Sequence, residues 1–265
     1  MRLQHALLSA LRNLVIPKQN KEAIIKAGLV QTILPMLEIH QPPVVFKLLG
    51  TLRMTVDGQA QLAHELLENE ILIKQLVLWS NTSDYSSVNG ESFRLMAWLI
   101  KHAYKDTTAI TVASNQASTT KTTQTSTAKG QTPATVTSDT ANPKSLKVFV
   151  QTDGAVASMV NMLTSQHLVM QNEALIALCI ITSVFNTRTS SDVNLDELFI
   201  KCDLGGKLAE FIVRNADTMT KEIVENVQIL MQLLRISSKL IEHLNLHNID
   251  ELLKSIPILT EYCTL

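Results

Sequence analysis

Glycine, proline, aromatic residues and cysteine are all scarce in this 265-residue chain. It contains 8 Gly and 7 Pro, whereas average usage would give roughly 19 and 13. Aromatic residues make up 4% of the chain. Strands are rich in aromatic and β-branched residues, and turn-dense β folds need glycine. The scarcity therefore excludes β-sandwiches, propellers and collagen-like chains, and it argues against folds with glycine-rich phosphate-binding loops.

Leucine is the abundant residue, with 38 copies in a chain that is 46% apolar. This composition is typical of helices. We find no apolar run of the ~18 residues that a membrane span needs, and the N-terminus lacks the apolar core of a signal peptide. The three cysteines, Cys179, Cys202 and Cys263, fit reduced thiols better than a disulfide framework. We therefore expect an all-α cytosolic protein without membrane insertion.

Charge is balanced overall but distributed unevenly. The net charge is −1, which argues against nucleic acid as a partner. Residues 1–105 carry 11 basic and 8 acidic groups (11 − 8 = +3), and residues 192–265 carry 7 basic and 12 acidic groups (7 − 12 = −5). The acidic end is interpreted either as a solvated face or as a docking surface for a basic partner.

One segment, 106–142, differs in composition from its surroundings. It consists mostly of Thr, Ser, Ala and Gln and has almost no large apolar side chains. Such a segment buries too little area to offset the entropy of ordering it. The sequence therefore predicts three parts: helical repeats in 1–105, a disordered Ser/Thr-rich loop in 106–142, and helical repeats in 143–265.

The flanks of this loop contain an internal repeat. Five segments share a short amphipathic stretch, a break and a second apolar helix: 22–37, 63–79, 147–163, 197–213 and 240–256. Glycine or asparagine, which accept a left-handed helix end, stands at each predicted break: Gly28, Asn69, Gly154, Gly205-Gly206 and Asn248. A longer apolar helix is predicted after each of the first four pairs, at 42–54, 91–103, 167–185 and 221–236, and segment 3–16 aligns with it.

The repeat has a period of roughly 42–50 residues once the loop is removed, which matches an armadillo-type α-solenoid. Two-helix HEAT repeats are the near alternative. The fold prediction is an all-α, right-handed superhelix of three-helix repeats. Because the chain opens on a third helix, we expect Met1 to lie inside a longer natural protein. We also expect exposure on one side of four leucines, Leu3, Leu7, Leu8 and Leu11.

The motifs do not indicate an enzyme. GxxxxGK[ST], GxGxxG and GxSxG are absent from the sequence. His243 and His247 are spaced i, i+4, but Leu244 stands where a zinc protease needs glutamate. We predict neither a catalytic site nor a metal site, and no cofactor.

Asn13, in the motif Ala-Leu-Arg-Asn-Leu, is the most specific local feature. In armadillo proteins an asparagine here points into the concave groove, where its amide holds an extended partner backbone. The alternative is a surface asparagine, or one bonded to the loop at Pro17. Met54, Ile100 and Ile180 occupy the equivalent positions, so a continuous asparagine ladder is absent. This argues against a receptor for nuclear-localisation signals.

Four blocks of the sequence resemble successive blocks of one armadillo family. They are LQHALLSALRNLVIPKQNK, PPVVFKLLGTLRMTVDGQAQLA, NGESFRLMAWLIKH and HLVMQNEALIALCII. They are similar, in the same order, to the C-terminal repeats of the small-GTPase GDP-dissociation stimulator (smg-GDS) family, and most similar to an invertebrate member. The resemblance covers about 1–104 and 143–185 and is expected to fade over 186–265.

The resemblance implies a regulator of small GTPases rather than an enzyme. Members bind Rho- and Rap-type GTPases that carry a polybasic, prenylated tail, promote GDP release and escort the GTPase. The implied location is the cytosol, with association with endoplasmic reticulum or mitochondria, and the implied state is a monomer. A generic armadillo scaffold that binds extended peptides or adaptor proteins is the alternative.

The predicted binding surface is the concave face of the third helices. The residues expected to contact a partner on the matching blocks are Arg12, Asn13, Lys47, Arg53, Glu91, Arg94, Asn172 and Glu173. The amides would supply hydrogen bonds, and the charged groups would set register and orientation. The alternative for Lys47, Arg53 and Arg94 is a solvated helix face, and for Asn172 and Glu173 a cap-like turn.

Overall fold

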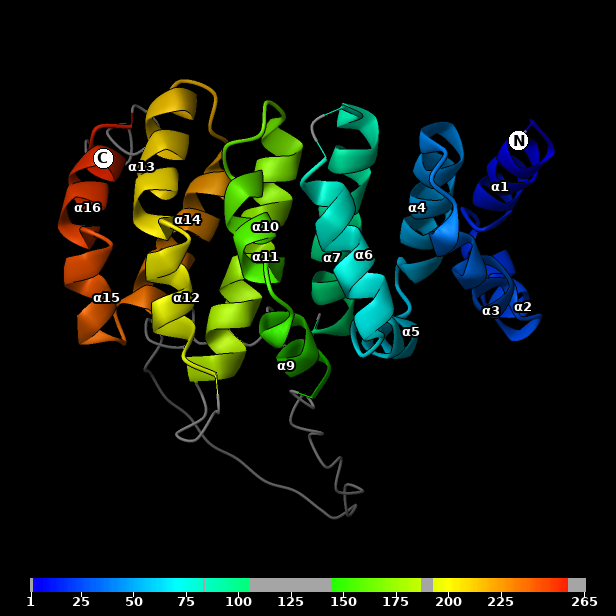
Figure 1. Ribbon diagram of the computed structural model, residues 1–265. Helices are drawn as coiled ribbons and strands as arrows, with labels where there is room; N and C mark the ends of the chain where they lie inside the picture. Colours follow the sequence, from blue (N-terminus) through cyan, green and yellow to red (C-terminus); the bar gives the residue numbers. More distant parts are fainter. Residues whose placement is uncertain (1, 83, 105–143, 187–192, 257–265) are drawn as a thin grey trace, which may run out of the picture.

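Helices make up almost all regular structure in the part of the chain that the computed structural model describes, residues 2–82, 84–104, 144–186 and 193–256 (Figure 1). No strand occurs among these residues. The first eight elements are α1 (Arg2–Leu14), α2 (Lys18–Lys26), α3 (Leu29–Ile33), the 3-10 helix η1 (Leu34–Glu38), α4 (Pro42–Val56), α5 (Ala60–Leu67), α6 (Glu70–Ser80) and α7 (Ser86–Ala103). The remaining eight are α9 (Lys144–Gln151), α10 (Ala155–Met162), α11 (Leu168–Asn186), α12 (Leu195–Lys201), α13 (Leu204–Asn215), α14 (Lys221–Leu234), α15 (Ser238–His243) and α16 (Leu246–Lys254).

The longest helices form a single row. Helix α1 packs on α4, α4 on α7, α7 on α11 and α11 on α14, so each predicted third helix contacts the third helix of the next unit. In Figure 1, the second helices α6, α10 and α13 lie in front of this row. The predicted all-α solenoid of three-helix units is therefore confirmed. The predicted loop 106–142 lies outside the described residues.

A continuous core runs through the stacked units. Leu48, Leu95, Leu175 and Leu230, one from each of four third helices, are completely buried. Burial of a leucine side chain contributes about 1.5–3 kcal/mol. Because each helix of a unit has a short apolar stripe that neighbours cover, medium-sized side chains fill the core and few aromatic residues are needed.

Helix α11 revises one sequence expectation. Among the described residues it is the helix long and apolar enough to cross a membrane by length and composition, with 67% of its apolar window buried inside the fold. It packs against α7, α10 and α14. Its apolar character therefore follows from its central place in the stack, where neighbours cover most of its circumference.

Two of the five predicted helix breaks lie where the sequence placed them with the expected geometry. Gly28 and Gly154 have φ of 84° and 80°, in the left-handed region that glycine adopts most readily. Asn69 also lies at a break, but its backbone is extended, and its side chain caps α6 by accepting a hydrogen bond from the Leu72 amide at 3.0 Å.

The other two predicted breaks were misplaced by a few residues. Asp203 and Asn245 have φ of 53° and 51°, and these residues make the left-handed turns. The Asp203 carboxylate also accepts a hydrogen bond from the Gly206 amide at 3.2 Å. Gly205 and Gly206 lie within α13, and Asn248 lies within α16. Asp and Asn tolerate this conformation because their side chains bond locally, so these turns do not need glycine.

The opening helix presents part of its apolar stripe to solvent. Leu3 and Leu7 are 71% and 53% exposed, as predicted, whereas Leu8 is buried and Leu11 is half-buried. The expectation of exposure was wrong for Leu8 because this side chain lies on the face of α1 that packs against α4. The apolar side chains of α1 are therefore divided between a side that α4 covers and a side that is open to solvent.

Lys21 links the first two units through a buried charge. Its side chain is 2% exposed, and its Nζ donates hydrogen bonds to the Asp57 main-chain oxygen at 2.8 Å and to Asp57 Oδ2 at 2.7 Å. On the next unit, His102 Nδ1 accepts a hydrogen bond from the Gly58 amide at 3.2 Å. The turn after α4 is thus held from both sides. The hydrogen bond from Lys21 lowers the pKa of Asp57 below its ordinary value.

We expect Asp57→Asn to lower the free energy of unfolding by about 1 kcal/mol at neutral pH, because Asp57 is part-exposed and its ion pair is partly screened. The lowered pKa means that ionised Asp57 contributes stability above the pKa of the unfolded chain, about 3.9. This contribution is lost as pH falls through the folded-state value. Urea unfolding at pH 7 and near pH 3 measures the difference. An equal native–variant difference at both pH values would contradict the assignment, and Glu70→Gln, in an exposed pair with Lys74, is the matched control.

Candidate partner-binding surface

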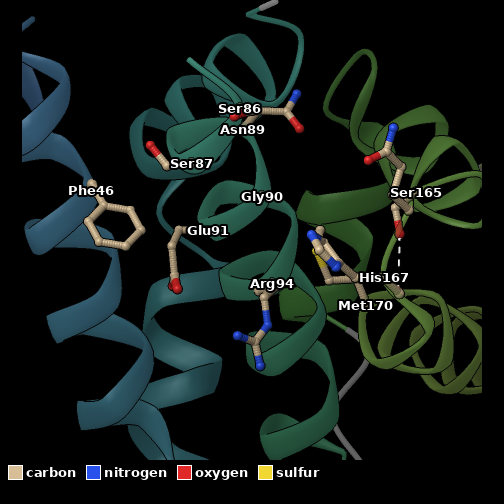
Figure 2. Close-up of a pocket in the computed structure, with 11 residues that line it drawn as sticks. Phe46, Ser86, Ser87, Asn89, Gly90, Glu91, Arg94, Ser165, His167 and Met170 are labelled. Carbon is tan, nitrogen blue, oxygen red and sulfur yellow. Dashed lines mark hydrogen bonds between the residues drawn. The ribbon is translucent and has the colours of Figure 1, made fainter.

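A pocket of about 370 Å³ opens on the row of third helices, between α4, α7 and the start of α11 (Figure 2). In Figure 2, Phe46 of α4 lies on one side of Gly90, and His167 and Met170 lie on the other. The residues that line the pocket are Phe46, Ser86, Ser87, Asn89, Gly90, Glu91, Arg94, Ser165, Gln166, His167 and Met170. Two of the predicted contact residues, Glu91 and Arg94, therefore belong to the pocket.

The local sequence of α7 shapes the pocket. The helix begins at Ser86, and the Asn89 side chain donates a hydrogen bond to the main-chain oxygen of Ser80, which ties the start of α7 to the end of α6. Gly90 follows on the same helix and has no side chain to fill the space in front of it. The first turns of α7 therefore form the floor of the pocket, while α4 and α11 form its walls.

Arg53 and Glu91 form a buried bidentate ion pair between α4 and α7. Arg53 Nε donates to Glu91 Oε2 at 2.9 Å and Arg53 Nη2 donates to Oε1 at 3.1 Å, with side chains 5% and 10% exposed. The guanidinium also lies 4.8 Å from the centre of the Trp98 ring, within cation–π range. Arg53 is therefore a structural residue: the solvated-face alternative is wrong for it, and its burial leaves no surface for the predicted partner contact.

Arg94 and Glu173 repeat this arrangement between α7 and α11. Arg94 Nε and Nη2 donate to the two Glu173 oxygens at 2.9 and 2.8 Å, and Trp98 Nε1 donates to Glu173 Oε1 at 2.8 Å. The hydrogen bonds to Glu173 raise the pKa of Arg94 above its ordinary value. Arg94 remains 26% exposed, so one edge of its guanidinium lies at the pocket while the other is held by Glu173.

Asn172 extends the polar contacts to α14. Its Nδ2 donates to Glu222 Oε1 at 3.2 Å, and its Oδ1 accepts from Asn226 Nδ2 at 2.8 Å. Asn172 and Glu173 lie inside α11, which begins at Leu168, so the cap-like-turn alternative is wrong. We call these contacts the polar row: Arg53–Glu91, Arg94–Glu173 and Glu222–Asn172–Asn226. The polar row joins four successive third helices.

The three remaining predicted contact residues also lie on third helices and, like Arg53, Asn172 and Glu173, outside the pocket lining. Arg12 is half-buried on α1, with its guanidinium against Gly50 of α4. Asn13 is exposed at the end of α1. Lys47 is half-buried, with its Nζ 5.7 Å from the centre of the Phe46 ring. A contact between these residues and a partner stays a prediction.

The sequence reasoning missed the apolar walls and the floor of the pocket. The sequence indicates only that Phe46 and Met170 belong to apolar helices, and it assigns Gly90 no role. A glycine inside a helical pattern is unfavourable by about 1 kcal/mol relative to alanine, so Gly90 is the residue of this group that the sequence marks as unusual. Phe46 and Met170 are not marked in this way, because apolar residues at helical spacing usually belong to the core.

The side chains do not assemble a site for metal or thiol chemistry in the part of the chain that is described. Among those residues, no group of three or more His, Cys, Asp or Glu side chains is arranged to hold a metal ion. His243 ends α15 and His247 lies in α16, so they are not on one continuous helix. Burial raises the pKa of the Cys179 thiol to about 12, which keeps it protonated and unreactive.

Comparison with known proteins identifies the family. The chain is 59% identical over 274 aligned residues to the GTPase-GDP dissociation stimulator vimar of Drosophila melanogaster, and the alignment covers 100% of the chain. The chain belongs to the GTPase-GDP dissociation stimulator family. It is also 39% and 38% identical over 183 residues to the Rap1 GTPase-GDP dissociation stimulators 1-B and 1-A of Xenopus laevis, over 69% of the chain. The similarity to the Drosophila protein includes 186–265, where the resemblance was expected to fade.

The chain covers only part of these family members. It spans 41% of the length of the Drosophila stimulator and 24% of each Xenopus stimulator. A search of family models finds no match. A crystal structure of an engineered protein aligns with 89% of the chain at 19% identity, with a TM-score of 0.45. The assignment to the stimulator family therefore rests on sequence identity.

Proposed function

We propose that the chain is a small-GTPase regulator that binds Rho- and Rap-type GTPases through the face of its third helices and stimulates GDP release. The observation that carries this proposal is the 59% identity, along the whole chain, to a protein named as a GTPase-GDP dissociation stimulator. In the same proposal the chain acts as a cytosolic monomer and escorts GTPases that carry a prenylated, polybasic tail. Association of the chain with endoplasmic reticulum or mitochondria would then follow from the GTPase that it carries to these membranes.

A binding surface is sufficient for this activity. A protein that binds the nucleotide-free GTPase more tightly than the GDP-bound form shifts the equilibrium toward GDP release, by as much as the difference between the two affinities. No bond needs to be made or broken by the stimulator itself. The pocket, which Arg94 lines, and the side chains of Asn13 and Lys47 lie on one row of helices.

Charge provides the second element of the proposal. Residues 192–265 carry an excess of five acidic groups over basic ones (12 − 7 = 5). An acidic region attracts a basic tail over distances of about a Debye length, roughly 8 Å at physiological salt. In this arrangement the GTPase domain binds near α4, α7 and α11, while its polybasic tail extends toward the acidic end.

The test is release of a fluorescent GDP analogue from purified Rho-type and Rap-type GTPases, with the 265-residue chain and a full-length relative in parallel. We expect faster release with the chain, and slower release after Lys47→Ala than after Lys74→Ala. Lys74 is a matched control because it is an exposed lysine on α6, in an i, i+4 pair with Glu70. Failure of both proteins to bind or accelerate any GTPase would refute the proposal.

A generic peptide-binding scaffold predicts a different result. Such a scaffold would bind the GDP-bound and the nucleotide-free forms of a GTPase with the same affinity. Charge reversal at Arg53 does not separate the two functions, because Arg53 is buried in the ion pair with Glu91 and its reversal affects folding. Surface variants at Lys47 and Asn13 are the informative ones.

A further inference from the structure

Gly90 is a glycine that the fold does not require. It lies inside α7 in ordinary right-handed helix, so its backbone does not need the freedom of glycine. A Cβ added at Gly90 would lie 3.6 Å from Met170 Cε and 3.9 Å from Met170 Sδ, which are ordinary contact distances. Glycine within a helix is destabilising relative to alanine. Neither the helix nor its packing therefore explains the missing side chain.

Other glycines in the described residues have a local reason. Three have positive φ, and at two others an added Cβ would come closer than 3.0 Å to a neighbouring atom: Gly28, Gly58 and Gly154, then Gly205 and Gly206. Gly50 resembles Gly90 in having room for a methyl group, with a flexible side chain at ordinary contact distance from each, Arg12 and Met170 respectively. Gly90 differs because it lines the open pocket, together with Phe46 and Met170, whereas Gly50 does not.

We call this pocket over Gly90 the hollow, and its walls suit an apolar side chain. Its volume of about 370 Å³ lies at the lower end of the range for ligand pockets. Phe46 and Met170 provide apolar walls, and a methionine thioether adapts to different shapes. Ser86 and Ser87 also line the hollow, and serine hydroxyls can both donate to and accept from a partner's backbone.

The charges around the hollow are already compensated. Glu91 is held by Arg53 at 2.9 Å, and Arg94 is held by Glu173 at 2.8 Å. A charged group entering the hollow would have to compete with one of these bidentate pairs, which are stronger than neutral hydrogen bonds. An uncharged apolar group would enter without disturbing either pair.

We propose that the hollow over Gly90 receives one uncharged apolar side chain from the surface of a protein partner and acts as the anchor of the interface. Anchors of this kind, seated in a pocket and shielded from water, carry much of the binding energy of protein interfaces. This inference rests on the proposed function, because the small GTPase is then the partner that supplies the side chain. The missing Cβ of Gly90 provides the space that this side chain occupies.

The first experiment fills the hollow from within. Affinity for nucleotide-free Rap-type and Rho-type GTPases is measured for the native chain, Gly90→Leu and Gly90→Ala. We expect Gly90→Leu to weaken binding by about tenfold or more, and Gly90→Ala, whose methyl group takes up part of the same space, to weaken it less. Lys74→Ala, an exposed lysine on α6 outside the pocket, is the control that should bind like the native chain. Circular dichroism verifies folding. If Gly90→Leu does not fold, Phe46→Ala removes one wall and is expected to weaken binding in its place.

The second experiment does not depend on a GTPase. The ¹³C-methyl signal of Met170, assigned with Met170→Leu, is followed while indole is added as a mimic of an apolar side chain, with acetate and guanidinium as charged probes. We expect indole to shift the signal in the native chain, to shift it less in Gly90→Ala and not at all in Gly90→Leu, and we expect the charged probes to have no such effect.

The two experiments separate the two proposals. If the native chain binds no GTPase but indole still shifts the Met170 signal, the proposed function fails and the apolar hollow stands. If GTPases bind native chain and folded Gly90→Leu equally, the anchor is refuted and the proposed function stands. A missing response to indole, or a preference for a charged probe, also refutes the apolar anchor.

Discussion

Arg53→Met is expected to lower the free energy of unfolding by about 3–5 kcal/mol, the cost of removing one partner from a buried ion pair. The substitution leaves Glu91 buried between α4 and α7 with neither of its two hydrogen bonds from Arg53. It also removes the guanidinium from the face of Trp98. Urea unfolding followed by circular dichroism measures the effect.

The double variant Arg53→Met with Glu91→Leu distinguishes a lost pair from a lost packing contact. Replacement of a whole buried pair by apolar residues of similar volume is often neutral or stabilising, so we expect the double variant to recover most of the loss. Lys74→Met is the matched control, because its pair with Glu70 is exposed and exposed pairs contribute about 0–1 kcal/mol. A double variant as unstable as Arg53→Met would show that the ion pair is not the cause.

Gly205→Ala is expected to lower the free energy of unfolding by about 3 kcal/mol, the upper end of the usual range for overpacking. An added Cβ would lie 2.3 Å from the Leu244 main-chain oxygen and 2.8 Å from its Cα. These are backbone atoms at the end of α15, so a rotamer change cannot relieve the clash. The last two units would have to separate.

The location of the effect is as diagnostic as its size. Hydrogen exchange of the α15 and α16 amides should accelerate in Gly205→Ala, because these two helices flank the displaced turn at Leu244 and Asn245. Gly90→Ala is the matched control, since its Cβ would meet Met170 only at ordinary contact distance; we expect it to leave stability unchanged or to raise it. An unchanged urea midpoint in Gly205→Ala would contradict the close approach.

The repeat itself could be predicted because its signal is local. Helical periodicity and the spacing of third helices depend on residues close together in sequence, and Gly28 and Gly154 stand at their turns with the predicted left-handed backbone. The breaks near Gly205 and Asn248 were misplaced because Asp203 and Asn245 make the same turn. Glycine, asparagine and aspartate can all adopt this left-handed conformation, so the sequence does not show which residue of the segment makes the turn.

The candidate surface was predictable only in part. The eight predicted residues do lie on third helices, as their helical spacing required. Their partners lie in other units: Arg53 meets Glu91, Arg94 meets Glu173, and these pairs are 38 and 79 residues apart in sequence. No spacing rule predicts such pairs, because their separation depends on the lengths of the intervening helices and loops.

The sequence by itself determined an all-α solenoid and the stimulator family, because helix periodicity, the repeat period and family identity are properties of the linear order of residues. Only the tertiary structure decided which polar side chains are buried and which remain open. Arg53 and Arg94 look alike in sequence, yet one is enclosed beneath Trp98 and the other reaches the pocket. The physical reason is that burial depends on what the neighbouring unit places opposite each residue. For the same reason, Gly205 cannot carry a side chain, because the Leu244 backbone lies against it, whereas Gly90 has room for one and forms the floor of the open pocket.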